Sequence, residues 1–253
     1  MEQLLRQMSP ITLAEMKSVK LMNRTDTKFV TTMPMLRRLL EMACDDYYVQ
    51  DIDGERNMLY DTTYFDTFDY AMFRQHQCGH AGRQKIRFRT YVSSNLQFLE
   101  VKTKNNHGRT KKKRVEVEDM DLNDPMKRQF LQKHLRFETD SLMPHMHNFF
   151  HRVTLVNKAK TERLTIDTRL NFHNLISGNN RDMGSLVIIE LKRDGLVSSP
   201  VLGMLRRLRI QPHGFSKYCM GAAMTSDCLR VNEFKPKLHY IEKILWRELS
   251  TAN

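Results

Sequence analysis

The sequence predicts an α+β fold that is mainly antiparallel β, with the strands closing into a barrel and helices at its periphery. Seven or eight segments have the period-two alternation of strands, whereas few have helical spacing. Four of the strand segments place basic side chains at every second position, so each basic set lies on one face of the sheet. Neither an internal repeat nor a low-complexity linker divides the 253 residues. We therefore expect one domain over residues 1–253.

In the first half of the chain, a weakly alternating lead-in over residues 11–22 precedes a strand from Asn23 to Val30. Met33-Pro34 then opens a helix, because the leucines that follow have helical spacing and proline is favoured in a first turn. The run Asn105–Gly108 is typical of a hairpin turn. Further strands are expected near residues 58–65, 83–92, 96–104 and 111–118, and a further helix near 124–136.

The second half repeats this logic. Strands are expected at 149–157, 161–168 and 185–192, with a polar loop at 177–180. Ser199-Pro200 is a capping residue followed by a first-turn proline, and it opens a helix through about Leu208. Another helix is expected from Ser216 to Met224. The tail over residues 234–250 has the apolar spacing of an amphipathic helix that docks on the body or on a partner.

The composition favours a polyanionic partner. The chain has 41 Lys and Arg against 29 Asp and Glu, a formal charge of +12, which suits nucleic acid, phosphate compounds or an anionic membrane surface. The four cysteines form no CxxC pair and are expected to be reduced thiols. The sequence has neither an export signal nor an apolar run long enough to span a bilayer. We expect a cytoplasmic protein, with any membrane association through a partner protein.

The alternating basic faces are the feature of the sequence that most clearly indicates a function. If they face the inside of a barrel, only water and bound anions can compensate so many like charges. Phosphoryl chains meet that demand, since arginine forks grip phosphate oxygens in bidentate fashion. For any single strand the alternative is a solvated face with cross-strand ion pairs. The faces consist of Arg24, Asp26 and Lys28; Lys85, Arg87 and Arg89; Glu100, Lys102 and Lys104; and Lys112 and Arg114.

A few carboxylates share these faces and are candidate ligands for a divalent cation that bridges phosphate oxygens: Asp26, Glu100, Asp167 and Glu190. Glu190 stands out because it lies in an apolar run typical of a central strand, where an unpaired carboxylate is costly.

Other motifs are weak or absent. The sequence has no P-loop motif. His145, His147 and His151 match no common metal-site spacing and are interpreted as surface or core residues. The run Lys111–Arg114 suits a nucleic-acid patch or the start of a strand equally well. Because the basic faces lack interleaved aromatic residues for stacking bases, nucleic acid is not the favoured partner.

Seven segments occur in the order seen in the VTC domain, which this sequence resembles over roughly residues 20 to 225. That domain is the polyphosphate polymerase domain of the vacuolar transporter chaperone complex, in the superfamily of triphosphate tunnel metalloenzymes shared with the CYTH phosphatases. The resemblance implies a tunnel-like β-barrel (the triphosphate tunnel fold) that transfers the γ-phosphate of ATP onto a growing polyphosphate chain, with Mn²⁺ or Mg²⁺. The segments are Asn23–Val30, Tyr64–Thr67, Lys85–Arg89, Phe98–Lys102, Glu162–Asp167, Ile189–Lys192 and Phe215–Tyr218.

The alternating faces and the resemblance together give the expected roles of individual residues. Glu190 is the expected metal ligand and Glu100 a second candidate. Catalytic roles are expected for Lys28, Arg87, Arg89, Lys102, Arg163 and Lys217. Substrate binding is expected of Arg24, Lys85, Lys104, Lys112, Arg114, Arg152, Lys192 and Ser216.

Two departures from related families matter. The first strand has Arg-x-Asp-x-Lys where the CYTH branch has ExExK, which argues against CYTH-type substrates such as thiamine triphosphate. The chain also lacks the SPX domain and membrane segments of the eukaryotic complex. Three functions stay open at this point: a polymerase, a triphosphatase or polyphosphatase in the same tunnel, and a non-catalytic module that binds polyphosphate or RNA.

Overall fold

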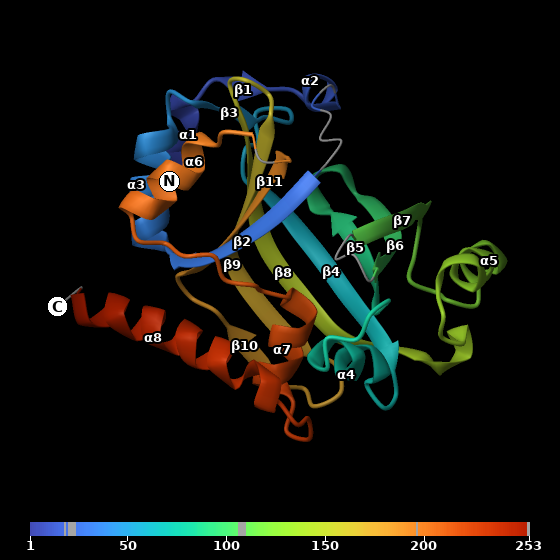
Figure 1. Ribbon diagram of the computed structural model, residues 1–253. Helices are drawn as coiled ribbons and strands as arrows, with labels where there is room; N and C mark the ends of the chain where they lie inside the picture. The colour runs from blue at the N-terminus through green and yellow to red at the C-terminus, as the bar shows by residue number, and fades with distance from the viewer. Residues whose placement is uncertain (18, 20–23, 106–109, 196, 252–253) are drawn as a thin grey trace.

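The computed structural model describes residues 1–17, 19, 24–105, 110–195 and 197–251, and its central feature is one curled, mainly antiparallel sheet (Figure 1). Hydrogen-bonded neighbours follow the order β2-β11-β9-β8-β4-β5-β6-β7, while β10 pairs with β9, and β3 joins β8 and, in parallel, β1. The strands are β1 (Pro10–Ile11), β2 (Arg24–Thr32), β3 (Tyr47–Gln50), β4 (Met58–Thr67), β5 (Gln84–Tyr91), β6 (Leu96–Lys104), β7 (Thr110–Val117), β8 (Leu142–Asn157), β9 (Glu162–Asn174), β10 (Asn180–Asp182) and β11 (Leu186–Asp194).

Short helices surround this sheet, in agreement with the predicted peripheral helices. They are α1 (Glu2–Gln7), α2 (Leu13–Lys17), α3 (Met33–Ala43), α4 (Ala71–Gln77), α5 (Pro125–His134), α6 (Pro200–Arg207), α7 (Lys217–Thr225) and α8 (Lys235–Thr251), with a 3₁₀ turn η3 (Asn232–Phe234) before α8. Among the described residues, no helix is long and apolar enough to cross a lipid bilayer.

The sheet is a half-barrel and not the closed barrel that the sequence predicted. Its edges are β2 and β7, and no pairing joins these two strands in the part of the chain that the structure describes. Both edges carry cations toward the concave face, Lys28 on β2 and Lys112 on β7 among them.

Most predicted elements are present, and several are longer than expected. The strands predicted at 149–157 and 161–168 extend to Leu142 and Asn174, with an irregular register near Phe149. Strands β6 and β7 form the expected antiparallel pair, although Asn23 and most of the turn Asn105–Gly108 lie outside the described residues. Helix α4 and strand β3 were not predicted.

The starts of α7 and α6 differ in their capping. Ser216 caps α7, because its hydroxyl accepts the Cys219 N–H at 3.3 Å. Ser199 precedes α6 but makes no capping hydrogen bond, and the Val201 N–H instead donates to the Tyr47 hydroxyl at 3.1 Å. The Val201 N–H, which has no partner within the first turn of α6, is therefore satisfied by a side chain of β3, far away in the sequence.

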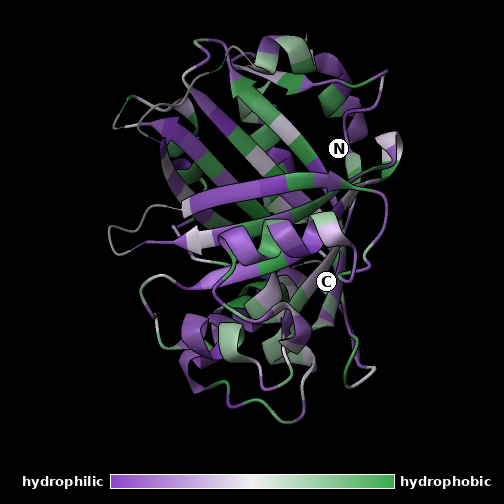
Figure 2. Ribbon diagram, turned by 90° about the vertical axis from the view of Figure 1, so that its right-hand side faces the viewer, coloured by the Kyte–Doolittle hydropathy of each residue, from purple (hydrophilic) through white to green (hydrophobic). Residues whose placement is uncertain are grey.

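The convex face of the sheet is covered by apolar packing. Helices α1, α3 and α6 pack on the outward residues of β2, β9 and β11, such as Phe29, Ile166 and Ile189. Helix α5 covers β5 and β6 through Leu131, which packs with Phe88 and Leu99. Apolar and hydrophilic segments alternate along the strands in Figure 2, as the period-two pattern predicted. The basic residues between these apolar ones therefore point to the concave face.

Helices α7 and α4 fill one end of the concave face, with α8 outside them (Figure 1). The fully buried Asp66 carboxylate ties these elements together, because it accepts the N–H groups of Met72 and Phe73 on α4 and the Tyr218 hydroxyl on α7. The predicted C-terminal helix is present as α8, and it docks on the body through the buried Ile241.

Candidate active site

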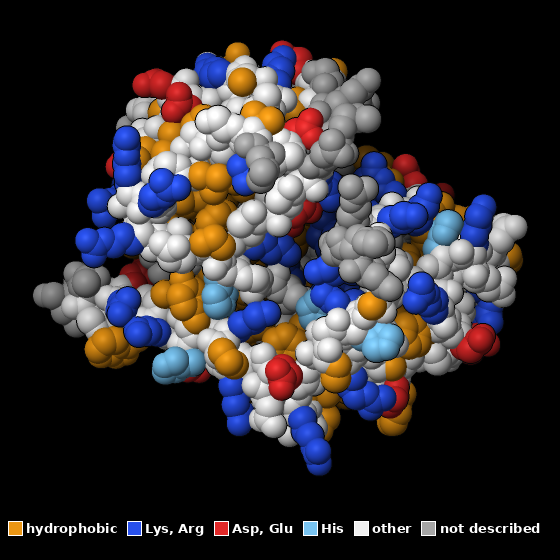
Figure 3. All heavy atoms as spheres, in the orientation of Figure 1, with side chains coloured by type: hydrophobic (Ala, Val, Ile, Leu, Met, Phe, Trp, Pro, Cys, Tyr) orange, Lys and Arg blue, Asp and Glu red, His pale blue; other side chains and the backbone are white. Residues whose placement is uncertain are grey.

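A basic cavity of about 630 Å³ occupies the concave face of the half-barrel. Thirteen Lys and Arg side chains and three carboxylates, those of Asp26, Asp167 and Glu190, are among the described residues that line it. Figure 3 shows Lys and Arg side chains gathered in the hollow at the centre of that view. Such an excess of cations in a partly enclosed space attracts anions strongly.

The strand register places cations side by side across β5, β6 and β7. Lys85, Lys102 and Lys112 pair in one row, and the row beside it has Arg87, Glu100 and Arg114. The neighbouring Arg87 and then burial lower the pKa of Lys102 well below its ordinary value. We call Lys85, Lys102 and Lys112 the lysine row. Three adjacent ammonium groups repel one another unless an anion lies between them.

Glu100 lies beneath this wall and is fully buried. Arg87 donates from Nε to its carboxylate at 2.7 Å, and the Lys112 ammonium lies 3.0 Å from its other oxygen. Burial alone would raise the pKa of Glu100, but Arg87 and Arg89 outweigh it, so the carboxylate is held ionised. Because Glu100 is fully buried beneath the lining of the cavity, whereas Glu190 lines it, the geometry favours positioning of Arg87 over metal coordination for Glu100.

On the opposite wall, Asp167 of β9 holds Arg152 and Lys217. The Arg152 guanidinium makes a bidentate pair with the carboxylate, at 2.5 and 2.7 Å, and Lys217 of α7 donates to the same group. The Phe150 ring lies 4.2 Å from the Lys217 ammonium. Burial lowers the pKa of Lys217 to about 7, against the opposing effect of Asp167. Lys217 therefore exchanges its proton near neutral pH.

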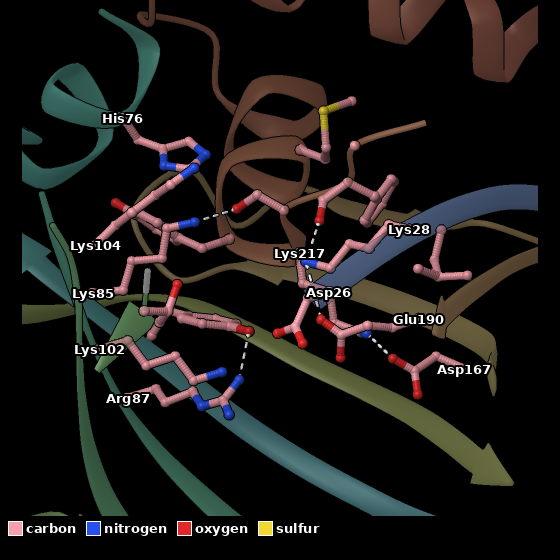
Figure 4. A pocket seen from close by; sticks show the side chains of 18 of the residues that line it. Asp26, Lys28, His76, Lys85, Arg87, Lys102, Lys104, Asp167, Glu190 and Lys217 are labelled. Atoms are coloured by element: carbon pink, nitrogen blue, oxygen red, sulfur yellow. Dashed lines mark hydrogen bonds and ion pairs between the residues drawn. The ribbon is translucent and has the colours of Figure 1, made fainter. Parts of the chain in front are cut away.

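Glu190 lies on the interior strand β11 and forms an ion pair with Lys192. A second ion pair joins it to Lys28 at 3.7 Å, and Figure 4 shows these two side chains near each other. Burial opposes ionisation, but Lys192 and Lys28 outweigh it and hold the pKa of Glu190 well below its ordinary value. The Lys28 ammonium also donates to the Phe215 carbonyl at 3.0 Å, just before α7. An ionised carboxylate is thus fixed among cations that face the cavity.

The start of α7 is tied to the basic wall. Lys85 donates to the Ser216 hydroxyl at 2.6 Å, and the same oxygen caps α7. Burial lowers the pKa of Lys85 to about 8, and Lys28 also contributes. Arg89 has its pKa lowered to about 10 by burial and then by Arg87. Both pKa values are lowered for the same reason, because these side chains are buried away from water and lie next to other cations.

The structure brings most of the predicted site residues together. Three lie elsewhere: Glu100 is beneath the wall, Arg114 stacks over the Phe98 ring at 4.5 Å, and Arg163 donates to the Met16 carbonyl at 3.0 Å. Those that line the cavity are Arg24, Lys28, Lys85, Arg87, Arg89, Lys102, Lys104, Lys112, Arg152, Glu190, Lys192, Ser216 and Lys217.

Several lining residues escaped the sequence prediction, among them Tyr64, His76, Arg83 and Lys237. Arg83 continues the alternation of Lys85 by one more step, so extending the pattern would have found it. His76 and Lys237 come from α4 and α8, whose placement at the cavity follows from long-range packing. No local pattern in the sequence carries that information.

The donor set decides what kind of metal site fits. Within the described ranges, no group of three or more His, Cys, Asp or Glu side chains is arranged to hold a metal ion. Glu190 nonetheless offers one ionised carboxylate inside the cavity. Mg²⁺ and similar cations are often held by one or two carboxylates together with substrate phosphates and water. The residues present therefore fit a cation shared between Glu190 and phosphate oxygens.

Comparison with known proteins adds a family. The sequence model of the VTC domain matches residues 23–226. The search of curated proteins finds no match.

Solved structures resemble the chain only distantly. A protein from Hippeastrum, described as an adenylyl cyclase candidate with a dominant triphosphatase activity, has a TM-score of 0.48 and 15% identity over 82% of this chain and 98% of its own. An adenylate cyclase candidate from Vibrio parahaemolyticus has a TM-score of 0.47 and 10% identity over 79% of this chain and 97% of its own. Both TM-scores are below 0.5, so the likeness to these structures is distant.

Proposed function

The chain belongs to the VTC domain family, and we propose that it is a polyphosphate polymerase, which transfers the γ-phosphate of ATP onto a growing chain of inorganic polyphosphate. Membership of this family supports a role in polyphosphate or triphosphate chemistry. The observation that carries the proposal is the ionised Glu190 carboxylate, fixed inside a cavity whose walls are otherwise mostly cationic. An anion-binding module gains nothing from such a carboxylate, whereas phosphoryl transfer with a divalent cation does.

The cationic walls would bind the triphosphate of ATP and the end of the phosphate chain. Arg87, Arg89 and the lysine row offer donors from one wall, and Arg152 and Lys217 offer them from the other. Arginine forks suit phosphate oxygens geometrically, and the partly dry setting strengthens each charge-assisted hydrogen bond. Two reactants held between two walls are also oriented toward each other, which is the main requirement of phosphoryl transfer.

The transfer itself needs no protein nucleophile. An oxygen of the chain's terminal phosphate, or of orthophosphate, attacks the γ-phosphorus, the bond to the β–γ bridging oxygen breaks, and ADP leaves with that electron pair. Arg87, Arg89 and Lys102 would stabilise the charge that spreads over the transferred group. Lys217, with a pKa of about 7, is partly protonated at neutral pH, and its ammonium form would donate a hydrogen bond to the leaving oxygen.

A divalent cation, Mn²⁺ or Mg²⁺, would be held by Glu190 together with phosphate oxygens. When bound, it neutralises phosphate charge and polarises the P–O bonds. Lys28 and Lys192 pair with Glu190 and also line the cavity, so each would be available to phosphate if Glu190 held the cation. The protein itself would therefore supply the ionised Glu190 carboxylate for the cation and two neighbouring lysines for the phosphate oxygens.

The test is to incubate the purified protein with ATP and Mn²⁺ and resolve the products on a polyphosphate gel. We expect chains that lengthen with time. Orthophosphate without chains would replace the polymerase by a hydrolase, and retained polyphosphate or RNA binding without turnover would indicate a non-catalytic module.

A matched pair of variants tests the role of Glu190. Glu190→Gln keeps the shape and should abolish turnover while polyphosphate still binds, because the wall loses only a negative charge. Glu242→Gln makes the same change at an exposed position of α8 and should leave turnover unchanged. Turnover by Glu190→Gln at the rate of Glu242→Gln would contradict the assignment of the metal.

A further inference from the structure

A second group of donors lies at the side of the cavity away from Glu190 and Asp167. The cavity lining includes His76, Arg83, Lys104 and Lys237, and Arg83 is hydrogen-bonded to His76. Figure 4 shows His76, Lys104 and Lys85 on one side of the pocket, with Glu190 and Asp167 on the other. The reaction proposed above uses none of the side chains of His76, Arg83 or Lys237. We call these three residues the distal group.

The distal group is assembled partly by a segment beyond the family match, which ends at residue 226. Phe234 of η3 stacks on the His76 ring, with centroids 6.4 Å apart and planes 11° apart. Gln77 of α4 donates to the Arg230 carbonyl at 2.8 Å. These contacts fasten the segment before α8 to α4. Lys237, in the first turn of α8, reaches the cavity as a result.

A second stack fixes the other flank of α8. The Tyr240 ring lies 4.1 Å from the His213 ring, with the planes 15° apart. The backbone of His213 is in turn bound to β2, because its backbone N–H donates to the Lys28 backbone carbonyl at 2.7 Å. The position of Lys237 is therefore set by packing against both α4 and the segment that leads to α7. A lysine held this way is placed for a ligand and is not simply a solvated surface charge.

Arg83 and His76 are also held in fixed orientations. Arg83 donates from Nε to Nδ1 of His76 at 3.1 Å and to the Gly79 and His80 carbonyls. Burial, together with Lys85, Arg83 and Lys237, lowers the pKa of His76 to about 2, so the ring is neutral. Since Nδ1 accepts the hydrogen bond, the ring proton is on Nε2, where it can serve as a donor.

We propose that His76, Arg83 and Lys237 form a distal subsite that binds phosphate units of a long polyphosphate chain beyond the reach of a triphosphate. The inference rests on the proposed function, because it assigns a further part of the same cavity to the same ligand. Arg83, Lys85, Arg87 and Arg89 follow one another at every second position. At about 3.3 Å per residue, that series is about 20 Å long. A triphosphate is too short to contact both its ends, whereas a longer chain can.

The experiment compares two ligands on the full chain, tripolyphosphate and long-chain polyphosphate, by isothermal titration at one fixed salt concentration. Lys237→Gln and Arg83→Gln should each weaken long-chain binding about fivefold, as expected when the protein loses one cation that lies near a polyanion. Their affinity for tripolyphosphate should stay at the wild-type value. Lys243→Gln, an equal charge change at an exposed position of the same helix, should leave both affinities unchanged. Lys237→Arg should restore long-chain binding.

The outcomes separate this inference from the proposed function. If Lys237→Gln and Arg83→Gln bind the long chain as tightly as wild type, or lose the same factor for both ligands, the distal subsite is overturned and the proposed function stands. If the wild-type protein binds neither ligand, both fail together. A circular dichroism melt of each variant excludes misfolding as the cause of a loss, and having two variants on different elements keeps the test decisive if one of them does not fold.

Discussion

Replacing Asp167 by Asn should destabilise the empty protein strongly, although the two side chains have the same shape. Asp167 is 3% exposed and is the counter-ion of both Arg152 and Lys217. Removing one partner of a buried ion pair costs about 3–5 kcal/mol, because the remaining charges are left buried and uncompensated. For a protein of this size, that corresponds to a fall in melting temperature of roughly 6–20 °C.

The assay is thermal and urea unfolding followed by circular dichroism, with and without tripolyphosphate. Because Arg152 and Lys217 face the cavity, a bound polyanion can replace the lost carboxylate. The gap between Asp167→Asn and wild type should therefore narrow when ligand is added. Asp140→Asn is the control, since Asp140 pairs with Arg128 but is 78% exposed, and its effect should stay within about 0.5 kcal/mol. A loss below about 1 kcal/mol for Asp167→Asn, or a gap that ligand leaves unchanged, would refute the reasoning.

Three further predictions concern pH, packing and capping. Bound phosphate favours the charged forms of Lys217 and Lys85, whose pKa values are about 7 and about 8, so tripolyphosphate affinity should fall between about pH 7 and 9 and binding should take up protons. Titration calorimetry in buffers of different ionisation enthalpy measures that uptake, and an affinity independent of pH would contradict the assignment. Gly221→Ala should cost about 1–3 kcal/mol in urea unfolding, because the added carbon would lie 2.7 Å from the Phe172 ring; an unchanged midpoint would show that the ring can move. Ser216→Ala should cost about 1 kcal/mol through the lost cap of α7, and a full wild-type melting temperature would argue that the cap is dispensable.

The basic faces of the sheet could be predicted because their signal is local. Period-two alternation assigns Lys85, Arg87 and Arg89 to one side of β5, and Ile86 and Phe88 pack on the other side. Once neighbouring strands pair in register, the lysine row follows. The residues of this cavity wall could therefore be predicted from the sequence, although the curvature of the sheet could not.

The parts that were missed depend on long-range packing or on where a face ends. Arg163 lies on the strand face that carries Asp167, but it is near the start of β9 and donates to the Met16 carbonyl of the N-terminal segment. Lys237 belongs to a helix whose amphipathic pattern predicts only that it docks. Closure of the sheet depends on whether β2 can pair with β7, and alternation within either strand contains no information about that pairing.

The lysine row has a consequence for how long the protein survives in a cell. Mutual repulsion among Lys85, Lys102 and Lys112 works against the folded state when the cavity is empty, and a bound polyanion removes it. Ligand at a hundred times its dissociation constant adds about 2.7 kcal/mol to the free energy of unfolding. A difference of that size changes how often the chain unfolds and is exposed to proteases. A polyanion that binds the cavity would therefore raise the amount of folded protein as its own concentration rises.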